Sequence, residues 1–179
     1  MSNIIEFIKK IPKAELHLHI EGTLEPDLLF KLAKKNNIQI PFENVNEVKS
    51  AYNFSNLESF LNIFYQGSRV LIKEQDFFDL TWAYALKCKE DNVVHAEIFF
   101  DPQTHVNRGI NFEIVVNGIY KALLKANKEF NLTSKIIMCF LRHLDEASAF
   151  KILDQALIHK DKIFGVGLDS SEKDHPPRK

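Results

Sequence analysis

Apolar runs alternate with amphipathic segments along the second half of the chain. Three short apolar stretches are typical of buried strands, and the two segments between them have the residue spacing of helices. The strands are expected at 93–102, 134–143 and 162–171, and the helices at 111–130 and 144–160. Strands that are apolar on both faces and are joined by helices predict an α/β fold, with a parallel sheet covered by helices.

The first half of the chain adds one more strand, expected at 14–20, and a group of helices. The helices are expected at 2–10, 25–37, 56–71 and 74–92, and residues 38–55 are expected to form a mixed loop region. No internal repeat, low-complexity segment or interdomain linker is visible in the sequence. Residues 1–179 are therefore expected to form a single domain with a sizeable core.

Charge and composition argue against several classes of partner. The formal net charge is −1, and no long run of lysine or arginine suggests a nucleic-acid partner. No run of 18 apolar residues suggests a membrane span, and the first residues lack the core and cleavage site of a signal peptide. The two distant cysteines, Cys88 and Cys139, are expected to be buried, reduced thiols. These features predict a cytoplasmic protein.

Polar, titratable residues follow each expected strand. In α/β folds the chemistry gathers at the carboxyl ends of the strands, so these residues are candidates for one functional mouth. The residues concerned are His17, His19, Glu21, Asp101, His105, Arg142, His143, Asp169 and Glu172. Polar loops also follow strands for purely structural reasons. The residues at the end of the first strand favour a functional site, whereas those at each other strand end, taken alone, fit a functional site and a polar loop equally well.

The two histidines of the first strand have a spacing that suits a metal. Side chains two residues apart on a strand point to the same face, so His17 and His19 are expected to project together. Neutral imidazoles are common zinc ligands, although a catalytic zinc needs about one further protein ligand and an open position. Leu16, Leu18 and Ile20 are expected to point the other way, into packing. By itself the pair is a weak signal, because two such histidines are more often surface or core residues.

Several separated motifs strengthen this interpretation. The segments "KAELHLHIEGTLEP" (13–26), 54–105 and "FGVGLDSSEKDHPPRK" (164–179) resemble, in the same order, the adenosine and adenine deaminase family of metal-dependent hydrolases. The forms "HIEG" and "GLDSSE" are similar to the adenine deaminase branch. The resemblance implies a TIM-barrel-type (β/α)8 fold with one zinc ion at the strand ends. It also implies hydrolytic deamination of a purine at C6 in purine salvage, which gives hypoxanthine or inosine and ammonia.

The resemblance also implies roles for individual residues. His17 and His19 match the first two metal ligands of the family, and Gly167 matches the segment whose backbone lies along the purine. Glu21 stands where nucleoside-using relatives have an aspartate that reaches the ribose. Because a longer glutamate would crowd that space, a free base is expected to be favoured over a nucleoside. Asp169 is expected at the mouth as a substrate-binding residue.

The chain departs from the family pattern in its extent. A complete barrel of this type takes about 250 residues, whereas this sequence supplies four strands. No residue matches the family's third histidine ligand, its proton-transferring glutamate, its further histidine or its metal-binding aspartate, and His175 does not fit. The chain is therefore expected to be an incomplete barrel of about four βα units, resembling the amino-terminal half of the enzyme. Low activity and self-association through unpaired sheet edges are expected.

Other functions remain open at this point. One is an adenosine deaminase that acts on the nucleoside, and another is a metallohydrolase for a different purine or pyrimidine. A third is a truncated gene product without catalysis, or a fragment that acts only with a partner chain. Zinc deaminases that edit nucleic acids are disfavoured, because their PCxxC motif is absent from the sequence.

Overall fold

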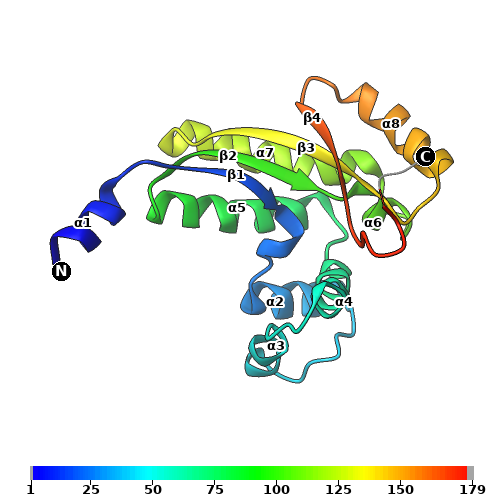
Figure 1. Cartoon of the computed structure of the whole chain (residues 1–179), viewed down its shortest axis with the longest axis horizontal. Coiled ribbons are helices and arrows are strands. Elements are labelled where there is room, and N and C mark those ends of the chain that lie inside the picture. The colour runs from blue at the N-terminus through cyan, green and yellow to red at the C-terminus, as the bar shows by residue number, and fades with distance from the viewer. Residues whose placement is uncertain (1, 177–179) are drawn as a thin grey trace.

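Four parallel strands form one sheet whose spatial order follows the order of the chain (Figure 1). The strands are β1 (Lys13–His19), β2 (Val93–Phe100), β3 (Thr133–Leu141) and β4 (Gly165–Asp169). The structure is a computed structural model that describes residues 2–176. Each neighbouring pair of strands is parallel, so all four carboxyl ends lie at the same end of the sheet. The predicted parallel sheet of an incomplete barrel is confirmed.

Helices cover one face of the two central strands. α5 (Glu74–Glu90) and α7 (Phe112–Phe130) pack against each other, and in Figure 1 α5 lies below the strands while α7 lies behind β2 and β3. A second group lies beyond the carboxyl end of β1: η1 (Ile20–Thr23), α2 (Pro26–Asn36), α3 (Val45–Ala51) and α4 (Leu57–Ser68). The remaining helices are α1 (Ser2–Lys10), α6 (Pro102–Val106) and α8 (Glu146–Ile158). Side chains of this second group line the space next to the carboxyl ends of the strands.

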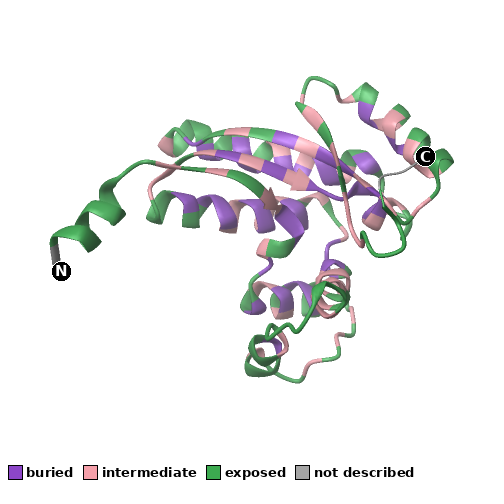
Figure 2. Ribbon diagram, viewed as in Figure 1, coloured by how far each residue is buried: buried purple, intermediate pink, exposed green. Residues whose placement is uncertain are grey.

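The core lies between the sheet and the α5–α7 pair. Alternate residues of β2, namely Ala96, Ile98 and Phe100, have no exposed surface and face these helices. The two helices approach closely at Gly118, where an added Cβ would lie 2.5 Å from the carbonyl oxygen of Glu74. Figure 2 shows buried residues concentrated in this central region. The helices hold the strands in place by packing on one face of the sheet. The candidate functional site described below lies on the other face.

Two local expectations were wrong. Residues 38–55 are not only a loop, because they contain α3. The side chain of Asn44 caps this helix by accepting hydrogen bonds from the backbone N–H groups of Asn46 and Glu47. Leu16 does not pack inside, because its side chain is 57% exposed. A register shift between Glu15 and Leu18 interrupts the alternation that predicted a packed Leu16.

The edge strands are less covered than the centre. β1 and β4 are the outer strands of the described sheet, and Val166 and Leu168 of β4 are 59% and 49% exposed. α1 extends away from the sheet and exposes Ile4, Ile5, Phe7 and Ile8. Both cysteines are buried and free of disulfides, as predicted. Within residues 2–176, no helix has the length and apolar character needed to cross a membrane.

Candidate functional site

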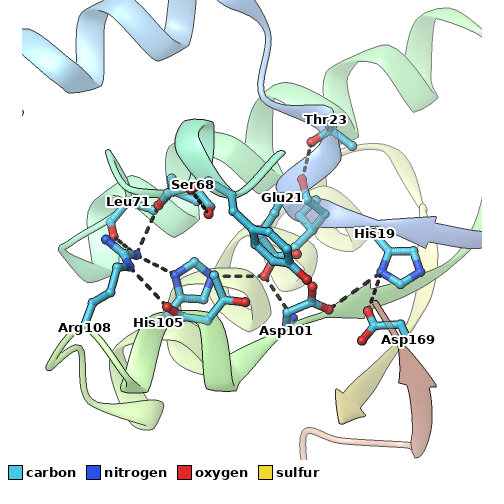
Figure 3. Close-up of polar contacts among 12 residues, drawn as sticks. His19, Glu21, Thr23, Ser68, Leu71, Asp101, His105, Arg108 and Asp169 are labelled. Atoms are coloured by element: carbon cyan, nitrogen blue, oxygen red, sulfur yellow. Dashed lines mark hydrogen bonds and ion pairs between the residues drawn. The ribbon is translucent and has the colours of Figure 1, made fainter. Parts of the chain in front are cut away.

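Four potential metal ligands from four strands converge at the carboxyl end of the sheet. His19 and Asp169 are the last residues of β1 and β4, Asp101 directly follows β2, and Cys139 lies in β3. One potential ligand atom from each residue lies within 4.8 Å of those from the other three. Figure 3 shows dashed lines from His19 to the carboxylates of both Asp101 and Asp169. We call these four residues the metal-side cluster.

Ionic interactions dominate the metal-side cluster. Nδ1 of His19 lies 3.3 Å from Oδ2 of Asp169 and 3.7 Å from Oδ1 of Asp101. Burial alone lowers the pKa of His19, but the two carboxylates outweigh this effect and raise it to about 10. Burial and then the charge of Glu21 hold the pKa of Asp101 well above its usual range. Burial acts on Asp169 in the same direction, but its contacts with His19 and Asp101 lower its pKa overall.

The metal-side cluster fits a metal ion. Asp101 and Asp169 each bury an oxygen, Oδ1, that has no hydrogen-bond partner among the described residues. Such oxygens are costly without a cation or a donor. An imidazole and two carboxylates are also a donor set that zinc accepts. The Cys139 thiol stays protonated without a metal, because burial and the charge of Asp169 raise its pKa. The residues present are therefore compatible with a divalent ion.

His17 lies beside this cluster, outside the group of four. Its ring stacks on Phe99 with the centroids 4.4 Å apart, and its centroid lies 5.5 Å from that of His19. The two histidines therefore lie next to each other, as their spacing predicts. Gly167 pairs with Cys139 in the ladder, and an added Cβ would lie 3.0 Å from Sγ of that cysteine. Their roles as metal ligand and as purine contact stay predictions.

A small cavity opens next to the cluster. Its volume is about 160 Å³, and it is lined by His19, Asp101, Asp169 and Ser170 together with Leu57, Phe60, Leu61, Phe64 and Tyr65 of α4. The hydroxyls of Tyr65 and Ser170 are 2.9 Å apart and join α4 to the end of β4. Burial raises the pKa of Tyr65 to about 12, so its hydroxyl remains a donor. We call this space the metal-side cavity, and its volume suits a small ligand.

A second cavity lies against the same helix. It has a volume of about 140 Å³ and is lined by Glu21, Gly22, Leu24, Tyr52, Phe54, Phe60, Ile63, Phe64 and Gly67. Phe60 and Phe64 line both cavities and are only half-buried. We call this space the Glu21 cavity. Adjacent spaces that share two aromatic walls could together hold one planar ligand with polar groups at both ends.

Glu21 is buried in a hydrogen-bonded network. Its Oε1 accepts hydrogen bonds from the backbone N–H of Asp101 and from Nε2 of His105, each at 3.0 Å. Its other oxygen, Oε2, is buried without a hydrogen-bond partner among residues 2–176. The predicted substrate-binding residue is therefore tied on one side to a residue of the metal-side cluster. Its role towards a substrate stays a prediction.

Several participants had no role assigned from the sequence. Asp101 and His105 were only candidates for the mouth, and Cys139 was expected to be a packing thiol. Phe60 and Phe64 have the helical spacing of core residues, which gave no sign that they line cavities. The position of Asp101 directly after a strand was the one usable signal. A larger cavity, about 560 Å³, lies at the amino end of β3, far along the strand from this cluster.

Comparisons with known proteins agree with the motifs. The family model described as adenosine deaminase matches residues 12–179. An adenine deaminase from Psychrobacter cryohalolentis is 61% identical over 176 residues, which are 98% of this chain and 53% of that protein. The crystal structure of an adenine deaminase from Arthrobacter aurescens has a TM-score of 0.89 at 46% identity, and the match covers 93% of this chain and 51% of that one.

A further crystal structure bears on the metal. An amidohydrolase from Burkholderia ambifaria, with bound zinc, has a TM-score of 0.84 at 25% identity, covering 96% of this chain and 48% of that chain. The chain spans about half the length of the relatives it matches. The resemblance inferred from the motifs is confirmed, and so is the incomplete TIM-barrel-type fold.

Proposed function

Because the chain belongs to the adenosine deaminase family, we propose that it supplies metal-binding and purine-binding residues for the deamination of adenine. The reaction is hydrolysis at C6, giving hypoxanthine and ammonia, within purine salvage in the cytoplasm. The observation that carries this proposal is a buried metal-side cluster that opens directly onto a small cavity with aromatic walls. Relatives named adenine deaminase at about 60% identity support adenine as the substrate.

Zinc is the metal that we propose. The zinc-bound structural relative and the nitrogen and oxygen donors of the cluster support it. A bound zinc ion supplies Lewis-acid activation of water. His17 and His19 are the proposed imidazole ligands, and the carboxylates of Asp101 and Asp169 are the proposed oxygen donors.

The protein's own side chains add binding and proton handling. The rings of Phe60 and Phe64 line the metal-side cavity and offer faces on which a purine can stack. Asp101 is a carboxyl whose pKa is raised, first by burial and then by the charge of Glu21, which favours its protonated form. Gly167 leaves the sheet surface beside Phe99 free of a side chain. These properties suit a planar, neutral base.

The activity of this chain alone is expected to be low. The part of the chain that the structure describes brings neither a third histidine nor a glutamate into the metal-side cluster. Loss of general acid–base catalysis alone costs roughly 10²–10⁴ in rate. Adenosine is the alternative substrate, and we propose that the free base is favoured because Glu21 crowds the space that a ribose would need.

A second proposal concerns self-association. The outer strands β1 and β4 leave unpaired edges in the described sheet, and apolar side chains are exposed beside them. The exposed apolar residues include Leu16, Phe150, Leu157, Ile158, Phe164, Val166 and Leu168. These features support pairing with another copy or with a partner chain, which would also cover the open side of the site.

An adenine deamination assay tests the main proposal. The purified chain is loaded with Zn²⁺, and turnover of adenine and of adenosine is compared with that of His17→Ala. His95→Ala is a matched control, because His95 lies on the same sheet at its opposite end. Weak turnover of adenine that is lost in His17→Ala and kept in His95→Ala would support the proposal. Faster turnover of adenosine than of adenine would overturn the choice of substrate.

A further inference from the structure

We propose that His105 and Arg108 are positioning residues that hold Glu21 as a fixed hydrogen-bond acceptor for the ring N–H of a free purine base. The inference rests on the proposed function and deepens it, because it gives a chemical reason for the choice of free base over nucleoside. Two observations carry it: the tautomer that Arg108 imposes on His105, and the unpartnered oxygen that Glu21 keeps beside the aromatic cavity.

Arg108 decides the protonation of the His105 ring. An arginine side chain only donates hydrogen bonds, and Nη2 of Arg108 lies 2.9 Å from Nδ1 of His105. Nδ1 must therefore be the acceptor, which leaves the ring proton on Nε2. Nε2 lies 3.0 Å from Oε1 of Glu21 and donates to it. His105 has no exposed surface, and the ring of Phe77 packs against it edge-on at 4.8 Å, so the ring cannot turn easily.

Arg108 is itself held by the end of α4. Its guanidinium donates to the carbonyl oxygens of Ser68, Arg69 and Leu71 at 3.0–3.1 Å (Figure 3). These carbonyls lie at the carboxyl end of the helix, where a positive charge is favourable. The same helix carries Phe60 and Phe64, which wall both cavities. Arg108 thus couples the orientation of Glu21, through His105, to the position of Phe60 and Phe64, through α4.

Glu21 then has one oxygen that is occupied and one that is free. Oε1 receives two donors, from the backbone of Asp101 and from His105. Oε2 has no hydrogen-bond partner among the described residues, although Glu21 lines the Glu21 cavity. Phe60 and Phe64 line the same cavity as Glu21 and are only half-buried. A ligand donor there would satisfy a buried acceptor that is costly when unpaired.

This acceptor discriminates by chemistry rather than by size. The five-membered ring of free adenine carries an N–H group, whereas in a nucleoside the corresponding nitrogen is bonded to the sugar. A site built around a buried acceptor rejects a ligand that lacks the donor. Steric crowding by the long Glu21 side chain would also reject the nucleoside. A variant that changes the polarity of this side chain without changing its size distinguishes crowding from hydrogen bonding.

Glu21→Gln is that variant. The donors of Asp101 and His105 hold the amide oxygen where Oε1 lies now, so the amide nitrogen replaces Oε2 and presents a donor. The crowding explanation predicts unchanged selectivity for adenine over 9-methyladenine, because the side chain keeps its size. The acceptor explanation predicts that the wild type prefers adenine by about 100-fold, the cost of one unsatisfied buried acceptor, and that the preference falls to within a few-fold of unity in Glu21→Gln.

Variants of His105 test the positioning role. His105→Leu removes both hydrogen bonds and should lose the preference for adenine, whereas His105→Gln offers an amide acceptor and donor and should retain it. Asp76→Asn is the control for general destabilisation, because it weakens a buried carboxylate network with Lys35 and Asn36 away from both cavities. The control should keep the wild-type ratio of affinities, since a ratio is insensitive to a uniform loss of folded protein.

Isothermal calorimetry on the Zn²⁺-loaded chain gives the affinities for adenine and 9-methyladenine, and nitrogen-15 NMR gives the tautomer of His105. A proton on Nδ1, or a wild-type ratio near unity, would overturn the inference while leaving adenine binding and the proposed function intact. An unchanged ratio in Glu21→Gln and His105→Leu would do the same. Absence of adenine binding by the wild type would overturn the proposed function and this inference with it.

Discussion

Two polar groups meet at Asp101 and differ in how completely the protein satisfies them. On one side, Arg108, His105 and Glu21 form a chain of hydrogen bonds that ends at the backbone N–H of Asp101. On the other side, the carboxylates of Asp101 and Asp169 flank His19 and each keep a buried oxygen without a hydrogen-bond partner among the described residues. In the first group, only Oε2 of Glu21 lacks a hydrogen-bond partner among the described residues. In the second group two largely buried carboxylates share one histidine, an arrangement that suits ligand binding better than stability.

The largest expected effect is on metal binding by the incomplete group. His19→Ala and Asp169→Asn should each lower the affinity for Zn²⁺ by about 100-fold or more, since each removes a donor from the metal-side cluster. Competition with a chromophoric chelator measures this affinity. His95→Ala should bind zinc as the wild type does. Wild-type affinity in both cluster variants would show that the metal lies elsewhere.

Loss of Arg108 should act on stability instead. Arg108→Met leaves four carbonyl oxygens and Nδ1 of His105 without their donor, and should lower the free energy of unfolding by about 2 kcal/mol. Urea denaturation measures the change, with the exposed Lys128→Met as the control. Zinc affinity should change by less than about 10-fold. A loss of zinc-binding free energy larger than the loss of unfolding free energy would contradict the assignment of Arg108 to the structural group.

The contribution of His19, in the metal-side cluster, to the free energy of unfolding should depend on pH. The pKa of His19 is raised to about 10 in the metal-free fold, so its contribution to stability is full below its ordinary pKa of 6.5 and disappears as the pH rises through about 10. The stability difference between wild type and His19→Gln, about 1 kcal/mol after allowance for its partial exposure, should therefore shrink between pH 6.5 and pH 10. Urea denaturation at several pH values tests this, and a difference that grows with pH would be the contrary result.

The smallest expected effect is on the stability of the metal-free chain. Asp101→Asn should leave the free energy of unfolding unchanged or raise it by less than about 1 kcal/mol, because burial and the charge of Glu21 already disfavour the ionised carboxylate. The same variant should bind zinc less tightly than the wild type. Thermal denaturation with and without Zn²⁺ distinguishes the two effects. A strongly destabilised metal-free protein would place Asp101 in the structural group.

Much of the fold follows from local patterns in the sequence. The alternation after residue 93 predicted a parallel sheet, since apolar strands and amphipathic helices have distinct periods. The spacing of His17 and His19 predicted that they lie side by side. The predictions that were wrong also concerned local structure. A register shift in β1 exposed Leu16, and the helix α3 with its Asn44 cap was missed in a region expected to be mostly loop.

The sequence by itself determined the family, the parallel sheet and the pair of histidines at the end of the first strand. Only the tertiary structure decided that Asp101, Cys139 and Asp169 share one space with His19, and that Arg108 sets the tautomer of His105. The physical reason is that strand period and helix spacing act over a few residues. Contacts between residues 80 or more positions apart, such as that between Glu21 and His105, depend on how the whole sheet curves and how its ends converge.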